Sequence, residues 1–187
     1  MRNWTDTWFC GVQCSQYYVD FLIWEKMLNR YEAARIIEIG TLWGGFGLYL
    51  CAQAIQRGMD FQTFDIATHP RPGFGTTGPI ALETPLGRLF EFEKRFHKQD
   101  VFEDDGKAVK GLLALPGRSI LLCDGGNKPR EFGVFAPFAK EGDIIVVHDW
   151  GTEIRAQHVN YSLVDEIMTA EAEKYGSLSR FFMRRVG

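Results

Sequence analysis

One segment near the N-terminus constrains the fold of this chain more than any other. Residues 36–47 read Ile-Ile-Glu-Ile-Gly-Thr-Leu-Trp-Gly-Gly-Phe-Gly, an apolar run that ends in an acidic residue and a glycine-rich turn. A helical pattern follows over 45–57, and a second apolar run over 60–65 ends in Asp65. The helix N-terminus offers N–H groups to an anionic group, and Asp65 is placed to accept hydrogen bonds from ribose hydroxyls. This segment therefore predicts a site for a nucleoside-bearing cofactor.

The same alternation of apolar strands and amphipathic helices continues to the end of the chain. Strands are expected at residues 35–39, 60–65, 97–102, 119–123, 143–147 and 178–185. Helices are expected at residues 16–31, 45–57, 84–95, 104–114, from Pro129 onward and from Asn160 to Gly176. This order predicts a Rossmann-like, doubly wound, mostly parallel α/β sheet with right-handed crossovers.

A chain of 187 residues is long enough for one hydrophobic core, so we expect a single domain over 1–187. Its first part, 1–34, is an N-terminal segment and helix, in which residues 1–15 are expected to be irregular. Residues 67–79 are rich in proline and glycine and cannot form a regular helix or strand. They are predicted to form a lid loop at the carboxyl edge of the sheet.

Composition narrows the partners and the compartment. The net charge of −3 argues against broad attraction to nucleic acid or to a membrane surface. The sequence has no apolar run of the length that spans a bilayer. Four cysteines are few for a disulfide framework, and Cys51 and Cys123 fall in apolar patterns as small buried residues. A reducing cytoplasm is the expected location.

The glycine spacing separates two kinds of nucleotide-binding loop. A dinucleotide-binding loop has the pattern G-x-G-x-x-G, whereas residues 38–45 read E-x-G-x-x-x-G-G. In this pattern, and in the acidic residues that end later strands, the sequence resembles the class I S-adenosylmethionine-dependent methyltransferases. The residues that carry the resemblance are Glu38, Gly40, Thr41, Gly44, Gly45, Asp65, Asp100, Val101, Asp124, His148 and Asp149.

The resemblance implies a strand order of 3-2-1-4-5 followed by an antiparallel pair, with S-adenosylmethionine as the cofactor. The matched loop residues and Asp124 would contact the cofactor. Asp65 would bind its ribose, Ile66 would also contact the cofactor, and Asp100 and Val101 would lie beside its adenine. Because only one strand is predicted after the last helix, we expect a shortened C-terminal strand pair. A second copy of the chain could cover the resulting edge in a homodimer.

Polar residues also follow the fourth and fifth predicted strands. Asp124 and the His148-Asp149 pair end neighbouring strands, so their side chains could meet on one divalent ion. Here the resemblance narrows to two groups of metal-dependent small-molecule O-methyltransferases, the cephalosporin-hydroxylase type and the catechol O-methyltransferase type. The first comparison covers roughly residues 8–150. It includes Gly11 and Gln13, ahead of the first predicted helix, and Gln16 at its start.

The residue types at this site leave its chemistry open. Mg²⁺ prefers oxygen ligands, and an imidazole at His148 shifts the preference towards Mn²⁺, Fe²⁺ or Zn²⁺. Without a metal, His148 is a candidate general base that Asp149 orients, and a third interpretation has it simply cap a strand. Asn127 stands where relatives often carry a residue that assists deprotonation. The adjacent Lys128 joins Asp124, His148 and Asp149 as a catalytic candidate.

The function that these residues favour is methyl transfer to a hydroxyl group of a small molecule or sugar, with Trp43, Trp150 and Phe74 as candidate walls of the acceptor site. A nicotinamide-dependent oxidoreductase fits Asp65 but not the glycine spacing, and the sequence contains no Tyr-x-x-x-Lys. A cofactor-binding partner subunit without activity is the non-enzymatic alternative.

Overall fold

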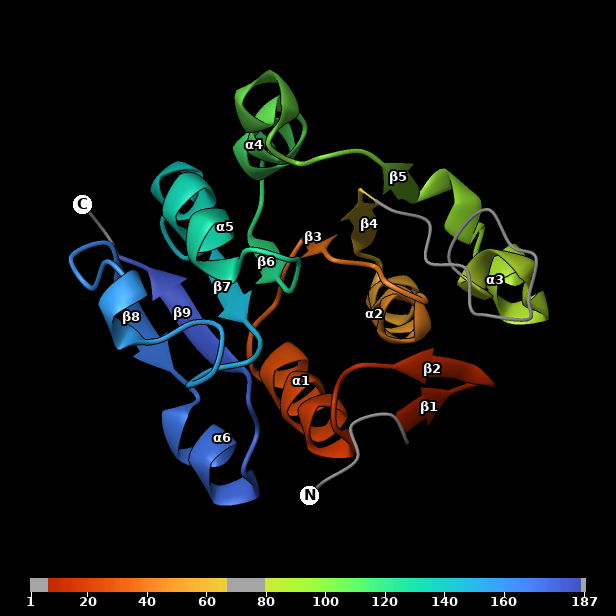
Figure 1. The fold of residues 1–187 in the computed structure, drawn as a ribbon, viewed down its shortest axis with the longest axis horizontal. Helices are drawn as coiled ribbons and strands as arrows, with labels where there is room; N and C mark the ends of the chain where they lie inside the picture. Colours follow the sequence, from red (N-terminus) through yellow and green to blue (C-terminus); the bar gives the residue numbers. More distant parts are fainter. Residues whose placement is uncertain (1–6, 67–79, 186–187) are drawn as a thin grey trace.

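A seven-stranded mixed sheet in the order β5-β4-β3-β6-β7-β9-β8 forms the centre of the computed structural model, which describes residues 7–66 and 80–185 (Figure 1). Its strands are β3 (Arg35–Ile39), β4 (Asp60–Asp65), β5 (Phe96–Lys98), β6 (Ser119–Cys123), β7 (Ile144–Val147), β8 (Val164–Ile167) and β9 (Arg180–Arg184). The first five are parallel and follow the predicted 3-2-1-4-5 order, which is thereby confirmed. The lid loop predicted at 67–79 lies outside the described residues.

Helices cover both faces of the sheet. They are α1 (Tyr18–Arg30), α2 (Gly45–Arg57), α3 (Pro85–Leu89), α4 (Lys107–Ala114), α5 (Lys128–Phe135) and α6 (Thr169–Tyr175). Figure 1 shows α1, α2 and α6 on one face of the sheet and α4 and α5 on the other. Ile36 packs in the core cluster that contains the buried residues of α1 and α2, and Ile37 packs in the cluster that contains those of α4 and α5. None of the helices within the described residues is long and apolar enough to cross a membrane.

The register of the parallel strands brings their carboxyl ends to one line. Ile39 is paired with Phe64 on one side and with Cys123 on the other. Cys123 is in turn paired with Val147. The residues that come next along the chain, at this edge of the sheet, are Gly40, Asp65, Asp124 and His148. The sheet itself therefore assembles most of the predicted site residues.

The C-terminal strand pair is complete, so the expectation of a shortened pair was wrong. A strand, β8, occupies residues that were predicted to be helical, and it pairs with β9 in antiparallel orientation. Asn160 does not begin a helix, because its Oδ1 accepts hydrogen bonds from the backbone and hydroxyl of Ser162 and closes a local turn. Helix α6 begins only after Met168, which has a positive φ of 60°. The homodimer was expected because a missing strand would leave an edge for a second copy to cover. Both strands are present, so this reason no longer applies.

Residues 7–14 form a hairpin, so the expectation of an irregular segment was wrong there, and residues 1–6 lie outside the described residues. Strands β1 (Thr7–Phe9) and β2 (Val12–Cys14) pair across a two-residue turn at Cys10 and Gly11. Both turn residues have positive φ, as a tight hairpin turn requires. The cysteine at the first turn position concealed this signal in the sequence.

Two other predicted elements are shorter than expected. The helix expected at 84–95 keeps its N-cap, since Thr84 Oγ1 accepts a hydrogen bond from Gly87 N at 2.9 Å, but it ends at Leu89. Glu91 then has a positive φ of 51°, which an α-helix cannot contain. The strand expected at 97–102 is confined to β5.

The position of β9 inside the sheet gives a stability prediction. Phe181 is fully buried, and its ring centroid lies 6.0 Å from that of Trp24. Phe181→Ala should lower the free energy of unfolding by about 3–5 kcal/mol, because it removes a buried ring and leaves a cavity. The half-exposed Phe138 provides the control, and Phe138→Ala should cost about 1 kcal/mol or less. Equal losses in urea denaturation would contradict the interior position of β9.

Candidate active site

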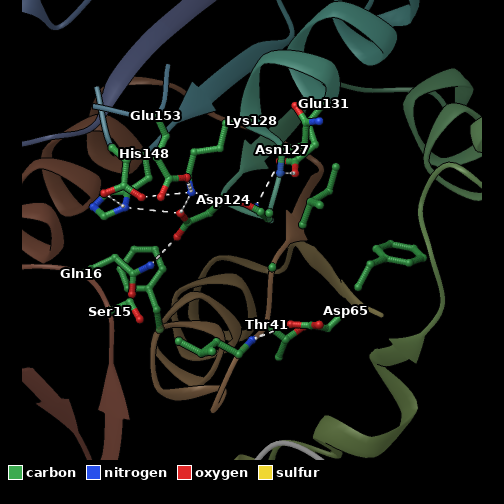
Figure 2. Close-up of a pocket in the computed structure, with 18 of the residues that line it drawn as sticks. Ser15, Gln16, Thr41, Asp65, Asp124, Asn127, Lys128, Glu131, His148 and Glu153 are labelled. Carbon is green, nitrogen blue, oxygen red and sulfur yellow. Dashed lines mark hydrogen bonds and ion pairs between the residues drawn. The ribbon is translucent and has the colours of Figure 1, made fainter. Parts of the chain in front are cut away.

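A cavity of about 810 Å³ opens at the carboxyl edge of the sheet (Figure 2). Its walls come from the loop at 40–45, the ends of β4, β6 and β7, the segment at 99–102 and the N-terminal residues 13–17. The hairpin and the start of α1 therefore close one side of a site that the sheet builds. This is the position at which open α/β sheets bind their ligands.

Two glycines allow the loop to pack against its neighbours. A Cβ atom on Gly40 would lie 2.3 Å from the carbonyl oxygen of Asp124, and the φ of Gly40 is +99°. A Cβ atom on Gly45 would lie 2.3 Å from the carbonyl oxygen of Gln13. Glycine is required at both positions because any side chain would push the loop away from β6 or from the hairpin. Gly40, Gly45 and the two other matched residues of the loop, Thr41 and Gly44, line the cavity.

The residues predicted to bind a ribose and an adenine lie on the same side of the cavity as this loop. Asp65 Oδ2 accepts a hydrogen bond from the backbone of Leu42 at 2.8 Å, which ties the end of β4 to the loop. Ile66, beside it, lines the cavity and is 68 % exposed. Asp100 and Val101 line the next part of the wall. The structure therefore brings these four predicted residues to one continuous surface.

Glu38 lies beneath the loop and does not line the cavity. It is buried, and Thr63 donates a hydrogen bond from its hydroxyl to Glu38 Oε2 at 2.6 Å. The hydroxyl of Thr63 lies 2.6 Å from that of Thr41, which links Glu38 to the loop. Burial raises the pKa of Glu38 to about 8, against the opposing effect of the Thr63 hydrogen bond. The structure therefore makes Glu38 a support for the loop.

Lys128, the first residue of α5, places its ammonium group among three carboxylates (Figure 2). Nζ lies 2.7 Å from Oε2 of Glu153, 3.0 Å from Oδ2 of Asp149 and 3.4 Å from Oδ1 of Asp124. Nζ also donates a hydrogen bond to the carbonyl of Gly125 at 3.1 Å. Burial would lower the pKa of Lys128, but the negative charges around it, that of Asp124 foremost, raise the pKa above its usual value. The group therefore stays charged at neutral pH.

His148 is enclosed by carboxylates on both sides of its ring. Nδ1 lies 3.3 Å from Oδ1 of Asp124 and 3.5 Å from Oδ1 of Asp149. Nε2 lies 3.5 Å from Oδ2 of Asp20. Burial would lower the pKa of His148, but these charges, led by Asp124, raise it well above the usual value, so the imidazole is protonated at neutral pH.

Asp20 is the main site residue that sequence reasoning missed. Its Oδ1 accepts hydrogen bonds from the hydroxyls of Ser177 at 2.5 Å and Ser179 at 3.0 Å, and its Oδ2 accepts one from the backbone of Tyr17. Burial opposes ionisation of Asp20, yet the contacts with His148 and the two serines hold its pKa below the usual range. A signal was present in the sequence, because Asp20 is an acidic residue on the apolar face of an amphipathic helix.

The expected metal ligands come together, because Asp124, His148 and Asp149 each offer a ligand atom and these atoms lie within 4.8 Å of one another. Lys128 and His148 already contact Oδ1 of Asp124. Gln16 Nε2 donates a hydrogen bond to Oδ2 of Asp124 at 2.5 Å. An ion held by both carboxylates would lie against the Lys128 ammonium group, and like charges repel. As arranged, these side chains do not fit a resident divalent ion.

The remaining candidates divide between the cavity and the core. Trp43 and Asn127 line the cavity. Trp150 instead packs on Phe182 in the core, with ring centroids 5.9 Å apart. Phe74 lies outside the described residues. Of the three expected aromatic walls, the structure therefore places one at the cavity.

Solved structures share this architecture. CmcI in a form with SAH matches with a TM-score of 0.65 and 14 % identity, over 99 % of this chain and 84 % of its own. CmcI with Mg-SAM matches with a TM-score of 0.63 and 14 % identity, over 99 % of this chain and 78 % of its own. A putative O-methyltransferase from Klebsiella pneumoniae gives 0.52 and 12 % identity, over 91 % and 81 %.

The fold is that of the class I methyltransferases. No protein-family model matches the sequence, and no curated protein matches it. The likeness to these solved structures is therefore one of fold, and it confirms the fold that the glycine loop and the alternation of strands and helices predicted.

The buried carboxyl of Glu38 gives a pH prediction. Its pKa of about 8 lies above the ordinary value of 4.5, so the folded protein binds more protons than the unfolded chain between these values. Stability should therefore fall as the pH rises through this window and level off above it. Glu38→Gln should flatten the curve and be more stable than the natural protein near the upper limit. The exposed Glu93→Gln is the control, and parallel urea-denaturation curves for the natural protein and Glu38→Gln would contradict this assignment.

Proposed function

We propose that this protein transfers a methyl group from S-adenosylmethionine to a hydroxyl group of a small molecule. One observation carries the proposal. Asp65 accepts a hydrogen bond from the backbone of Leu42, and this contact joins two walls of the cavity. Because of this contact, the carboxylate that we assign to the ribose lies directly beside the glycine loop. The close packing of Gly40 on Asp124 adds an acidic group to the same cavity.

The charged cluster on the opposite side of the cavity is suited to hold the acceptor. The side chain of Asp149 is 27 % exposed, compared with 8 % for that of Asp124, so Asp149 is the more accessible of the two carboxylates. We assign Asp149 as the group that accepts a hydrogen bond from the acceptor hydroxyl. The buried and protonated His148 then serves as a fixed positive charge that orients both carboxylates, and Asp20 positions it from behind.

The reaction needs an electrophile, a nucleophile and a proton acceptor in one dry site. S-adenosylmethionine, when bound, supplies a methyl carbon on a positively charged sulfur, which keeps the C–S electron pair as the acceptor oxygen forms the new C–O bond. The hydroxyl becomes strongly acidic as its oxygen gains the methyl group. Burial would raise the pKa of Asp149, but His148 and, to a lesser extent, Lys128 hold it below its usual range. The carboxylate can still take this proton, because the hydroxyl is by then far more acidic.

The alternatives differ in what they require of the cavity. A nicotinamide-dependent oxidoreductase would use Asp65 in the same way, but the glycine spacing does not favour a dinucleotide. A small hydroxylated acceptor suits an acidic cavity better than nucleic acid does, since phosphates would be repelled by the carboxylates. An inactive cofactor-binding subunit would bind the cofactor without turnover, which separate binding and turnover measurements distinguish.

Asp65→Ala tests the cofactor site. Removing a charged acceptor of ribose hydrogen bonds should weaken S-adenosylmethionine binding by about 10–100-fold in isothermal titration calorimetry. Asp60→Ala is the matched control, because Asp60 lies at the other end of the same strand, away from the cavity. Equal affinities for the two variants would remove Asp65 from the site, and tighter binding of NAD than of S-adenosylmethionine would favour the oxidoreductase.

Asp149→Asn tests the proton acceptor. The amide should lower kcat by at least about 100-fold, while cofactor affinity changes little. The rate is measured as S-adenosylhomocysteine release with an acceptor found in a panel of phenols and sugar alcohols. Asp165→Asn, on β8, is the control. An unchanged kcat would contradict the role of Asp149, and cofactor binding without any turnover across the panel would favour the inactive subunit.

A further inference from the structure

We propose that Lys128 is the resident cation of the acidic cluster at this cavity and takes the place that a divalent metal would occupy between Asp124 and Asp149. The inference deepens the proposed function, because it names the positive charge that organises the acceptor side of the site. The relevant observations are the contacts of the lysine, the engagement of the carboxylate oxygens and the local structure that holds the lysine in place.

The first observation is that the ammonium group bridges the two carboxylates that a metal would need. Nζ of Lys128 lies 3.0 Å from Asp149 and 3.4 Å from Asp124. A third carboxylate, Glu153, and the carbonyl of Gly125 complete its surroundings. These oxygen contacts satisfy an ammonium group, which has three N–H donors and no acceptor.

The second observation is that nitrogen atoms face each oxygen of both carboxylates. Oδ1 of Asp149 faces the imidazole of His148, and its Oδ2 faces Lys128. Oδ1 of Asp124 faces the same two cations. Oδ2 of Asp124 accepts the hydrogen bond from Gln16. A divalent ion would have to displace at least one cation to reach both carboxylates.

The third observation is that the fold holds the lysine in this position. Asn127 caps α5 by accepting a hydrogen bond from Arg130 N, so the helix begins at Lys128. The buried Glu131 accepts hydrogen bonds from the backbone of Gly125 and Asn127, which fixes the turn before the helix. A cation is electrostatically disfavoured at a helix N-terminus. The carboxylates, and not α5 itself, therefore account for the position of this charge.

Metal binding by the full-length protein, without cofactor or acceptor, tests the proposal. Free Mn²⁺ is measured by electron paramagnetic resonance as the protein is added. The natural protein should bind Mn²⁺ no more tightly than a Kd of about 1 mM. Lys128→Met removes the resident charge and should bind Mn²⁺ at least about tenfold more tightly. The gain should disappear in Lys128→Met/Asp149→Asn.

Two controls isolate the effect of the lysine. Lys94→Met removes an equal charge from an exposed position and should bind Mn²⁺ as the natural protein does. Lys128→Arg keeps the charge and should show no gain. Tight binding of one Mn²⁺ per natural chain that Asp149→Asn abolishes would overturn the proposal, and so would a folded Lys128→Met that binds no more tightly. If Lys128→Met does not fold, Lys128→Gln is measured instead. It should bind Mn²⁺ more tightly than the natural protein, and equal binding would overturn the proposal. Neither cofactor nor acceptor is present in this experiment. A failure of the proposal about Lys128 would therefore not contradict the proposed methyl transfer, which is tested separately.

Discussion

The contact between the ammonium group of Lys128 and the carboxylates of Asp124 and Asp149 is the interaction on which the cavity depends most. Two carboxylates this close to each other would repel without a cation between them. Asp124 is also the residue on whose carbonyl the loop packs at Gly40. Asp124 therefore links the charge cluster to the glycine loop as one structural unit, and a shift of either would displace the other.

The sheet and the two ends of the chain supply this unit jointly. The pairing of β3 with β4 and β6, and of β6 with β7, brings the strand ends into line without help from the loops. The first helix adds Asp20 from the opposite side, and the serines that hold Asp20 lie just before β9. The C-terminal strand pair thus reaches the site through a buried carboxylate that itself does not line the cavity.

The sequence alone predicted what regular patterns determine. The apolar strands, the helix expected at 45–57 and the acidic residues at the ends of β4 and β6 follow local rules, and the structure confirms them. The C-terminal helix was mispredicted because the spacing of Val164 and Ile167 fits a helix face as well as a short strand. Tertiary pairing with β9 decides between the two.

The site was less predictable, because its charges act across long sequence separations. Asp20 and His148 are 128 positions apart, and no local pattern links them. The direction of the Lys128 side chain could not be read from its position beside Asn127. The structure resolves it because Glu153, from the turn after β7, meets the same ammonium group. Local periodicity therefore predicts the strands and helices, whereas the contacts between buried charges can be known only from the three-dimensional structure.

The assignment of the cavity as a cofactor site is best tested by a crystal structure of the protein grown with S-adenosylhomocysteine. Electron density for this compound is expected in the cavity, with its ribose hydroxyls within hydrogen-bonding distance of Asp65 and its sulfur on the side of Asp124. Density with the ribose away from Asp65, or a cavity that remains empty at a saturating concentration of the compound, would contradict it.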